Sequence, residues 1–228
     1  EITLLNPNTG TCPVFRSRRD AEITLDIYRR VPVLVKEGDP EGNPWGVSFM
    51  TMFHMANDSY MFRSREHLEK DGWFLEGNVF VRGDKRMLPL YEAKMVNFYN
   101  HRAADVVKSA TAAKRQNQPR YLTSDELRLP NRFPGPLNWV LQSDSPSREF
   151  RDNEKPEVTV ESRLQDVQWG REWLYGWCDV TSPTNERSSV PVIIPRVAVG
   201  HKFMLTLLPA DARSVACLCA CQSSFVFD

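Results

Sequence analysis

The chain has 228 residues, 41% of them hydrophobic, and its 29 basic and 29 acidic side chains leave no formal net charge. This length supports one large domain or two small ones, and the balanced charge argues against a protein that holds nucleic acid by bulk electrostatic attraction. The sequence contains neither an apolar run long enough to span a bilayer nor a signal peptide, and its odd number of cysteines, five, is typical of reduced thiols. We therefore expect a cytoplasmic protein without membrane contacts.

Short helices and strands that follow one another without regular alternation predict an α+β fold with long surface loops. Capping patterns and apolar residues at helical spacing predict helices at 17–31, 64–70, 92–113 and 158–167, with a last helix that Asp211 opens. Apolar runs predict strands at 45–53, 79–81, 87–90, 173–180, 190–194 and 203–208. The helix over 92–113 is expected to be the longest, and residues 82–86 are expected to form a hairpin turn.

The composition changes twice along the chain and divides it into three parts. Residues 116–156 contain many Pro, Ser, Asn and Asp residues and predict a loop-rich connection, with a short helix after Thr123. This connection separates an N-terminal part, residues 1–115, from a C-terminal part, residues 157–228. The chain begins without Met and ends in an apolar run, so we expect the parent protein to continue on both sides.

A polar segment between two strand-like apolar runs concentrates hydrogen-bonding groups at residues 179–188. Thr184, Asn185, Arg187 and Ser188 carry groups of the kind that bind base edges and phosphates. The alternative is a polar hairpin loop that caps itself, because Thr and Asn are common turn formers.

Two further segments concentrate positive charge and could line a cleft that contacts phosphates. The first is centred on Arg18 and Arg19, and the second contains Lys114 and Arg115. A solvated helix face is the alternative for both. Arg102 follows His101 on the expected long helix, where a packed or a DNA-facing position is predicted and no nucleophile motif accompanies the histidine.

Asp84, Glu92 and Lys94 are similar to part of a nuclease signature, in which carboxylates and a Glu-x-Lys pair hold Mg²⁺ and activate water. The spacing between Asp84 and Glu92 is short for this signature. Glu92 also has a simpler interpretation, since a glutamate at a helix N-terminus is favoured by the helix dipole.

Cys217, Cys219 and Cys221 lie two residues apart in the last expected helix and should therefore point to different sides. No His or Cys-x-x-Cys pair accompanies them. We expect small buried core residues and no metal at this place.

Four parts of the chain carry short sequence motifs. In chain order they read L-N-P-N-T-G-T from residue 5, L-P-L-Y-E-A-K-M from residue 88 with His101 and Arg102, D-V-T-S-P-T-N-E-R-S from residue 179, and V-G-H-K from residue 199 with S-F-V-F-D at the end. These motifs resemble segments of adenine-specific DNA methyltransferases from large single-chain bacterial restriction–modification and phage-defence systems. The chain departs from the family at Ala93, Cys178 and Ser188, where Gly, Arg and Thr are usual.

The resemblance implies a DNA target-recognition region that positions duplex DNA for an upstream methyltransferase domain of the same chain. Together with the charge pattern, it leads us to expect DNA binding by these residues: Thr184, Asn185, Arg187, Ser188, Arg18, Arg19, Arg102, Lys114 and Arg115. This sequence lacks a glycine-rich S-adenosylmethionine loop, and Thr9 stands where the Asn-Pro-Pro-aromatic motif needs a stacking ring. We therefore expect no cofactor here and S-adenosylmethionine in the parent protein. The alternatives are the metal-dependent nuclease and a protein-interaction module.

Overall fold

The computed structural model describes residues 1–11, 13–109, 117–143, 157–181, 186–225 and 227. The chain forms two compact units: unit 1 consists of residues 1–48 and 208–211, and unit 2 of residues 49–207 and 212–228. Helices and antiparallel sheets occur in similar proportions, so the α+β class predicted from the sequence is confirmed. The boundaries expected after residues 115 and 156 fall in segments outside the described residues and stay predictions.

Unit 1 contains the helices α1 (Ile2–Leu5) and α2 (Arg18–Arg30). α2 begins with the predicted capping box, in which the Asp20 N–H donates to Ser17 Oγ at 3.2 Å and the Ser17 N–H donates to Asp20 Oδ2 at 3.0 Å. In the Asn-Pro stretch that precedes it, Asn8 donates to the Val35 carbonyl and accepts from the Glu37 N–H, both at 2.9 Å. Asn8 therefore has an architectural role in unit 1.

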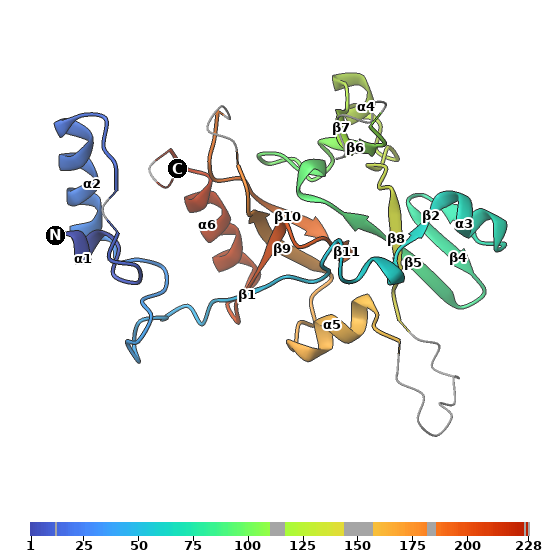
Figure 1. Cartoon of the computed structure of the whole chain (residues 1–228), viewed down its shortest axis with the longest axis horizontal. Coiled ribbons are helices and arrows are strands. Elements are labelled where there is room, and N and C mark those ends of the chain that lie inside the picture. The colour runs from blue at the N-terminus through green and yellow to red at the C-terminus, as the bar shows by residue number, and fades with distance from the viewer. Residues whose placement is uncertain (12, 110–116, 144–156, 182–185, 226, 228) are drawn as a thin grey trace. The chain divides into compact units, whose positions relative to one another are not determined.

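Unit 2 is built on three sheets of short strands (Figure 1). The first sheet has the order β1 (Ser48–Met50), β12 (Phe203–Leu207), β9 (Trp173–Cys178), β10 (Pro191–Pro195). The second has the order β2 (Arg63–Ser64), β8 (Asn138–Leu141), β5 (Lys85–Tyr91), β4 (Val79–Arg82), β3 (Phe74–Glu76), and β11 (Ala198–Val199) pairs with β5 in parallel. The third is the antiparallel pair β6 (Ala104–Val107) and β7 (Gln118–Tyr121).

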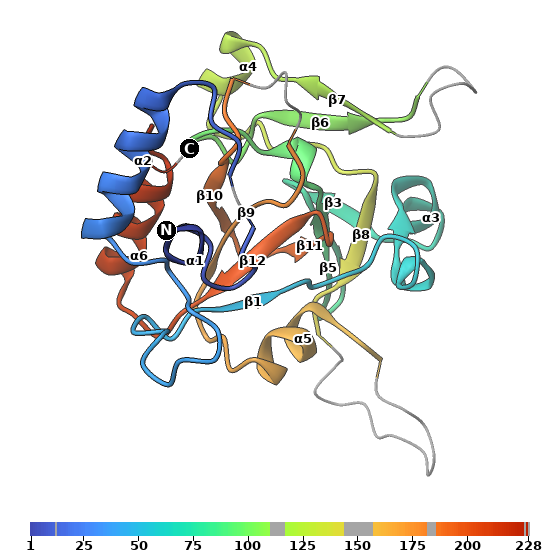
Figure 2. The same ribbon diagram turned by 60° about the vertical axis from the view of Figure 1, so that its left-hand side comes forward.

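The helices of unit 2 are short. They are η1 (Ser59–Met61), α3 (Arg65–Lys70), η2 (Ala93–Met95), α4 (Ser124–Arg128), α5 (Val160–Asp166) and α6 (Ala212–Gln222). The predicted helices that correspond to α3, α5 and α6 and the predicted short helix after Thr123 are confirmed. α6 packs against β10, and Figure 2 shows α4 close to β6 and β7.

One hydrophobic core joins the first two sheets of unit 2. Leu174 on β9, Ile194 on β10 and Leu205 on β12 are buried in the same cluster as Leu90 on β5. β9 and β12 approach closely because residue 176 is a glycine: a Cβ there would lie 2.4 Å from the Met204 carbonyl oxygen. This core holds the ends of β5 and β9 side by side.

The predicted long helix over 92–113 is wrong. This segment forms η2, a tight turn in which Asn97 and Asn100 exchange backbone hydrogen bonds, and then the strand β6. The Asn97 side chain accepts from the Phe98 N–H at 2.7 Å, a local bond that competes with helix formation. Pairing of β6 with β7 then decides the strand, because tertiary partners override an apolar spacing that also suits a helix. The predicted strand over 45–53 is shorter than expected and covers only β1.

Candidate functional site

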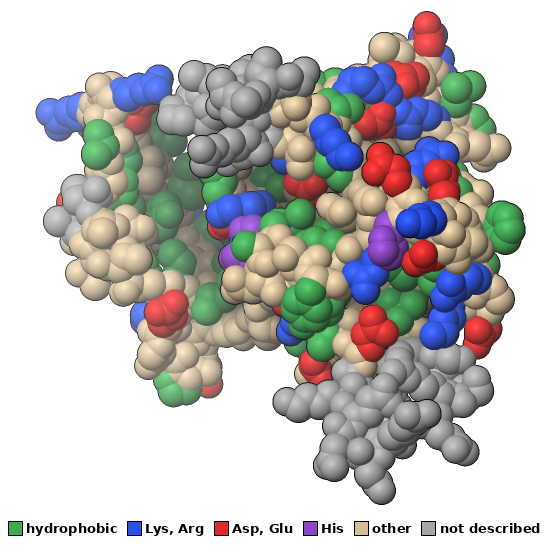
Figure 3. Space-filling model, turned by 45° about the vertical axis from the view of Figure 1, so that its right-hand side comes forward, with side chains coloured by type: hydrophobic (Ala, Val, Ile, Leu, Met, Phe, Trp, Pro, Cys, Tyr) green, Lys and Arg blue, Asp and Glu red, His purple; other side chains and the backbone are tan. Residues whose placement is uncertain are grey.

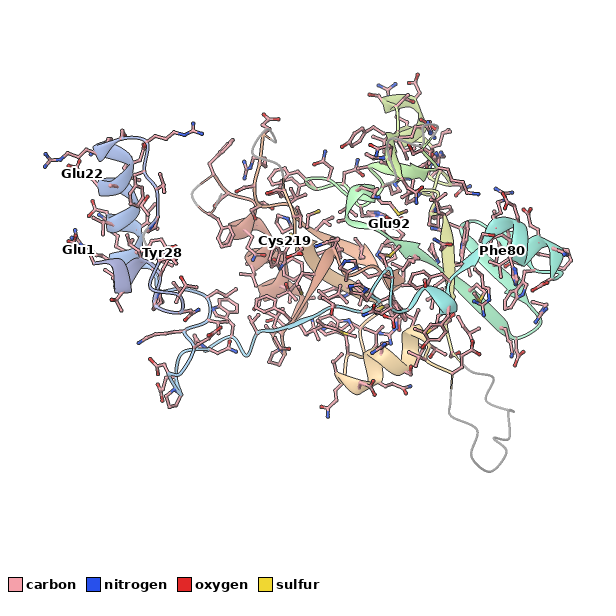
Figure 4. All side chains as sticks on the ribbon, in the orientation of Figure 1. Glu1, Glu22, Tyr28, Phe80, Glu92 and Cys219 are labelled. Atoms are coloured by element: carbon pink, nitrogen blue, oxygen red, sulfur yellow. The ribbon has the colours of Figure 1, made fainter. Side chains whose placement is uncertain are left out.

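Unit 2 contains a cleft of about 1160 Å³ at the place where β5 and β9 end. It brings residues 92–98 together with residues from the C-terminal part of the chain, which lie within 178–181, 186–190 and 200–202. Further walls come from the following residues: Met55, Asn117, Tyr121 and Phe225. Glu92, which marks the end of β5, is labelled near the middle of unit 2 in Figure 4, whereas Phe80 lies in the β-sheet region away from it.

The first wall of the cleft is formed by the residues that follow β5. The Met95 N–H donates to the Glu92 carbonyl at 2.8 Å and closes the short helix η2. Lys94 Nζ lies 3.0 Å from Glu92 Oε2 and donates to the Asn117 carbonyl at 2.9 Å. The side chains of Lys94 and Glu92 are 29% and 14% exposed, so the ammonium is held in one place at the edge of the cleft.

The second wall is a strap of residues 199–202 that is fixed on both sides by backbone hydrogen bonds. The Gly200 N–H donates to the Tyr91 carbonyl, and the His201 N–H donates to the Phe53 carbonyl, both at 2.8 Å. A Cβ at residue 200 would lie 3.0 Å from Met55 Sδ, so the glycine allows this close approach. The strap places His201 and Lys202 in the cleft.

His201 stacks on His54, with ring centroids 4.3 Å apart and an angle of 18° between the rings. The Met55 N–H donates to His201 Nδ1 at 3.3 Å, and the Ala56 and Asn57 N–H groups donate to His54 Nδ1. In its neutral form, each ring therefore carries its proton on Nε2. Burial lowers the pKa of His201, and the positive charges of His54 and Lys202 lower it further.

The third wall contains Arg187, whose guanidinium lies between two aromatic rings. Its Cζ is 4.7 Å from the centroid of Phe98 and 4.3 Å from that of Phe225. Its Nη2 donates to the Ser223 carbonyl at 2.7 Å, just after α6. Arg187 belongs to the polar segment 179–188, which we call the predicted recognition segment. Its contacts connect this segment with Phe98, which follows β5, and with Ser223 and Phe225, which follow α6.

The floor of the cleft is apolar and its rim is polar. Val96, Cys178 and Val190 are buried in the floor, and burial raises the pKa of the Cys178 thiol to about 11, so the thiol is neutral at physiological pH. Tyr121 on the rim is 63% exposed. Such a site offers apolar contact at its floor, and charged or hydrogen-bonding groups of both signs at its rim, where Glu92 and Glu186 lie with the lysines.

The other predicted DNA-binding residues do not line this cleft, or lie outside the described residues. Arg102 donates to three carbonyl oxygens around α4, those of Leu127, Leu129 and Arg132 at 3.0–3.2 Å. This gives Arg102 an architectural position. The neighbouring His101 is partly buried, and burial followed by the charge of Arg102 lowers its pKa.

Arg18 and Arg19 belong to unit 1, in the first turn of α2, where Glu22 lies 3.0 Å from Arg18 and 3.8 Å from Arg19. Ser188 is exposed beside Arg187. Thr184, Asn185, Lys114 and Arg115 lie outside the described residues. Figure 3 shows Lys and Arg side chains interspersed with Asp and Glu on one face of the molecule.

The residues of the nuclease alternative are not assembled. Asp84 lies in the turn between β4 and β5, whereas Glu92 follows the other end of β5. The seven residues of β5 rise by about 3.3 Å each, which separates the two carboxylates by roughly 20 Å. Within the described part of the chain, no group of three or more His, Cys, Asp or Glu residues is placed to hold a metal ion.

The three cysteines of α6 have different environments. Cys219 is buried in unit 2, as expected, but Cys217 and Cys221 are exposed, so the prediction of three buried core residues is wrong for these two. α6 is a surface helix with one buried side, and residues two apart cannot both face it. Figure 4 labels Cys219 on this helix.

Sequence reasoning missed several residues of the cleft. His201 and Lys202 belong to the V-G-H-K motif but carry no predicted role of their own, and the sequence predicts no role for Tyr121. The sequence gives no indication of a role for His54, because its partner His201 lies far along the chain.

Among the described residues, no helix is long and apolar enough to cross a bilayer.

Comparison with known proteins found no matching family model, no matching curated protein and no matching solved structure. The resemblance of the four short motifs to DNA methyltransferases therefore stays a prediction.

Proposed function

We propose that this chain is a DNA target-recognition region of an adenine-specific DNA methyltransferase of the restriction–modification type. In this proposal unit 2 contacts duplex DNA through the cleft, and an upstream domain of the same chain transfers the methyl group from S-adenosylmethionine. The observation that carries the proposal is the meeting of motifs at one cleft. Residues from three of the four motif groups line it: Lys94, Arg187 and Lys202. Lys94 lies far before the other two in the sequence, so the fold and not the local sequence brings the first group to the others.

The charges in the cleft suit a few local contacts with DNA phosphates, and the chain has no net positive charge that would attract DNA over a broad surface. Lys94 and Lys202 both line the cleft, and their ammonium groups are paired with Glu92 at 3.0 Å and with Asp179 at 3.5 Å. The Lys202–Asp179 pair is 54% and 35% exposed and is weak in water, so a phosphate can replace or join this carboxylate. A few such contacts bind a phosphate backbone without a large net positive charge.

Arg187 has a positioning role in this proposal. Its guanidinium is engaged by the Phe98 and Phe225 rings and by the Ser223 carbonyl, so it fixes the end of the segment that contains Thr184 and Asn185. Base contacts are assigned to that segment, and phosphate contacts to the lysines of the cleft.

The test is equilibrium binding of a fluorescein-labelled duplex to the 228-residue chain, followed by anisotropy from 50 to 200 mM salt. Each phosphate contact contributes about −0.9 to the slope of log K against log salt. Lys202→Ala should weaken binding and make the slope less steep by about this amount. Lys70→Ala is the matched control, because Lys70 is an exposed lysine of α3 that does not line the cleft.

Binding of duplex DNA that is lost at high salt and weakened only by Lys202→Ala supports the proposal. Absence of binding at 50 mM salt, or equal effects of the two substitutions, contradicts it and favours a protein-interaction module. Selection from a randomised duplex pool then measures sequence preference, which a target-recognition region requires.

A further inference from the structure

The cleft is concave, whereas protein surfaces that recognise paired bases protrude into a groove of the duplex. Proteins read base edges in a groove with an element that protrudes, such as a helix or a strand. The site in unit 2 recedes instead, with a volume of about 1160 Å³. This volume is slightly above that of most clefts that hold small organic molecules, about 300–1,000 Å³, so a nucleotide has room in it. A ligand that enters it must protrude from the duplex.

The floor of the cleft suits a flat apolar face. Val96, Val190 and the neutral thiol of Cys178 are buried there, and the Cys178 thiol donates to the Ala93 carbonyl at 3.5 Å. With that contact made inside the protein, the floor presents mainly carbon and sulfur atoms. A nucleobase has such a face, whereas a paired base keeps it covered by its neighbours in the stack.

The rim adds the groups that the rest of a nucleotide needs. Tyr121 is 63% exposed at the end of β7, and an exposed aromatic ring stacks on any base. Lys94 and Lys202 both line the cleft, and a phosphate there would compete with their carboxylate partners, Glu92 and Asp179. His201 accepts at Nδ1 from the Met55 N–H, which leaves a proton on Nε2 as a donor.

We propose that the cleft binds a single nucleotide that has left the base stack of DNA, with its base at the apolar floor and Tyr121, and its phosphate at Lys94 and Lys202. This inference rests on the proposed function, because it requires that the chain binds DNA. It adds a site for an extrahelical nucleotide within the recognition region itself, separate from the methyl-transfer site of the upstream domain. The site recognises the flat face of a base, so it accepts more than one base type.

The test compares two labelled duplexes that differ by one unpaired nucleotide in the centre of one strand. A bulged nucleotide leaves the stack at less cost than a paired one, so the wild-type chain should bind the bulged duplex about tenfold more tightly or better. Placing 2-aminopurine at the bulge gives a second readout, because its fluorescence changes when the base moves from the DNA stack onto protein.

Three variants locate the effect. Tyr121→Ala should abolish the preference for the bulge while duplex binding remains, and Tyr121→Phe should keep it, since the ring is retained. Tyr60→Ala is the matched control: Tyr60 is 70% exposed in η1 and does not line the cleft, so the preference should persist. Circular dichroism confirms that each variant is folded.

The outcomes separate this inference from the proposed function. Equal affinity of the wild-type chain for the two duplexes overturns the nucleotide site and leaves the DNA-binding proposal standing. A preference that survives Tyr121→Ala in a folded protein also overturns the site. Failure to bind either duplex overturns the proposed function, and the nucleotide site with it.

Discussion

Arg187 donates a hydrogen bond of 2.7 Å to the carbonyl of Ser223, and this bond joins the predicted recognition segment to the end of α6. The same guanidinium lies between Phe98 and Phe225. A side chain held in this way is suited to fix a segment in place. The sequence allows Arg187 to contact bases or to belong to a loop that is held by its own contacts, and this geometry favours a structural role.

We therefore expect Arg187→Ala to lower the stability of the protein. A hydrogen bond from a charged donor contributes about 1.5–3 kcal/mol and each cation–π contact about 0.5–1 kcal/mol at exposed sites; because Arg187 is only partly buried, we expect a loss of about 2 kcal/mol. For a chain of this size that corresponds to a fall in Tm of roughly 4–8 °C, measured by thermal unfolding. An unchanged Tm together with relaxed sequence choice in DNA binding would instead identify Arg187 as a base reader.

The close approach of β9 and β12 predicts a strong effect of Gly176→Ala. A Cβ at residue 176 would lie 2.4 Å from the Met204 carbonyl oxygen and 2.6 Å from the Phe203 ring, so the strands must separate. We expect a loss of about 1–3 kcal/mol in the free energy of unfolding, measured with urea. Gly170→Ala is the matched control, since a Cβ there meets no atom within 4 Å. Equal effects of both substitutions would show that strand contact at residue 176 is not the cause.

The stacked histidines predict that stability falls as the solution becomes mildly acidic. The pKa of His201 is lowered in the folded protein, by burial first and then by His54 and Lys202, so the folded state binds fewer protons than the unfolded state. The contribution of His201 to the free energy of unfolding is therefore fully present above the pKa of an unfolded histidine, about 6.5. It is lost as the pH falls below that value. Urea unfolding at pH 7.5 and 5.5 measures the loss, and His201→Gln should reduce it.

Two carboxylates, Glu126 and Glu161, make stability depend on pH in a lower range than His201 does. Hydrogen bonds from Arg120 and the Thr123 N–H hold the pKa of Glu126 at about 2, and Arg196 lowers the pKa of Glu161. Their contributions are present above the ordinary carboxylate range and decrease only below pH 4.5. A stability that is constant from pH 7.5 to 5.5 would contradict the assignment to His201.

The missing methyl-transfer motifs predict that this chain alone neither methylates DNA nor binds S-adenosylmethionine. Thr9 stands at the position of the stacking aromatic, and Asn8 in the same stretch is engaged with residues 35 and 37 of unit 1. Calorimetry should detect no heat of binding with S-adenosylmethionine, and labelled methyl groups should not enter adenine. Tight binding of the cofactor would place the chemistry in this chain.

Features that depend on neighbours along the chain could be predicted from the sequence. The capping box of Ser17 and Asp20, the helix that starts after Ser64 and the hairpin over 82–86 each depend on residues a few positions apart. Their hydrogen bonds form within one turn, so local spacing is sufficient. The α+β class follows from the same kind of pattern.

Only the tertiary structure decided what residues 92–113 and the cleft become. Apolar spacing in that segment suited a helix, but pairing of β6 with β7 and the Asn97 turn gave a strand. The contact of Met55 with His201 joins residues 146 positions apart, and no local pattern records it. The cleft exists because the sheets of unit 2 bury a common core. The free energy gained by burying apolar surface depends on the area buried and not on how far apart the residues are in the sequence. The sequence by itself therefore determined which residues cap and turn, whereas packing determined which distant residues meet.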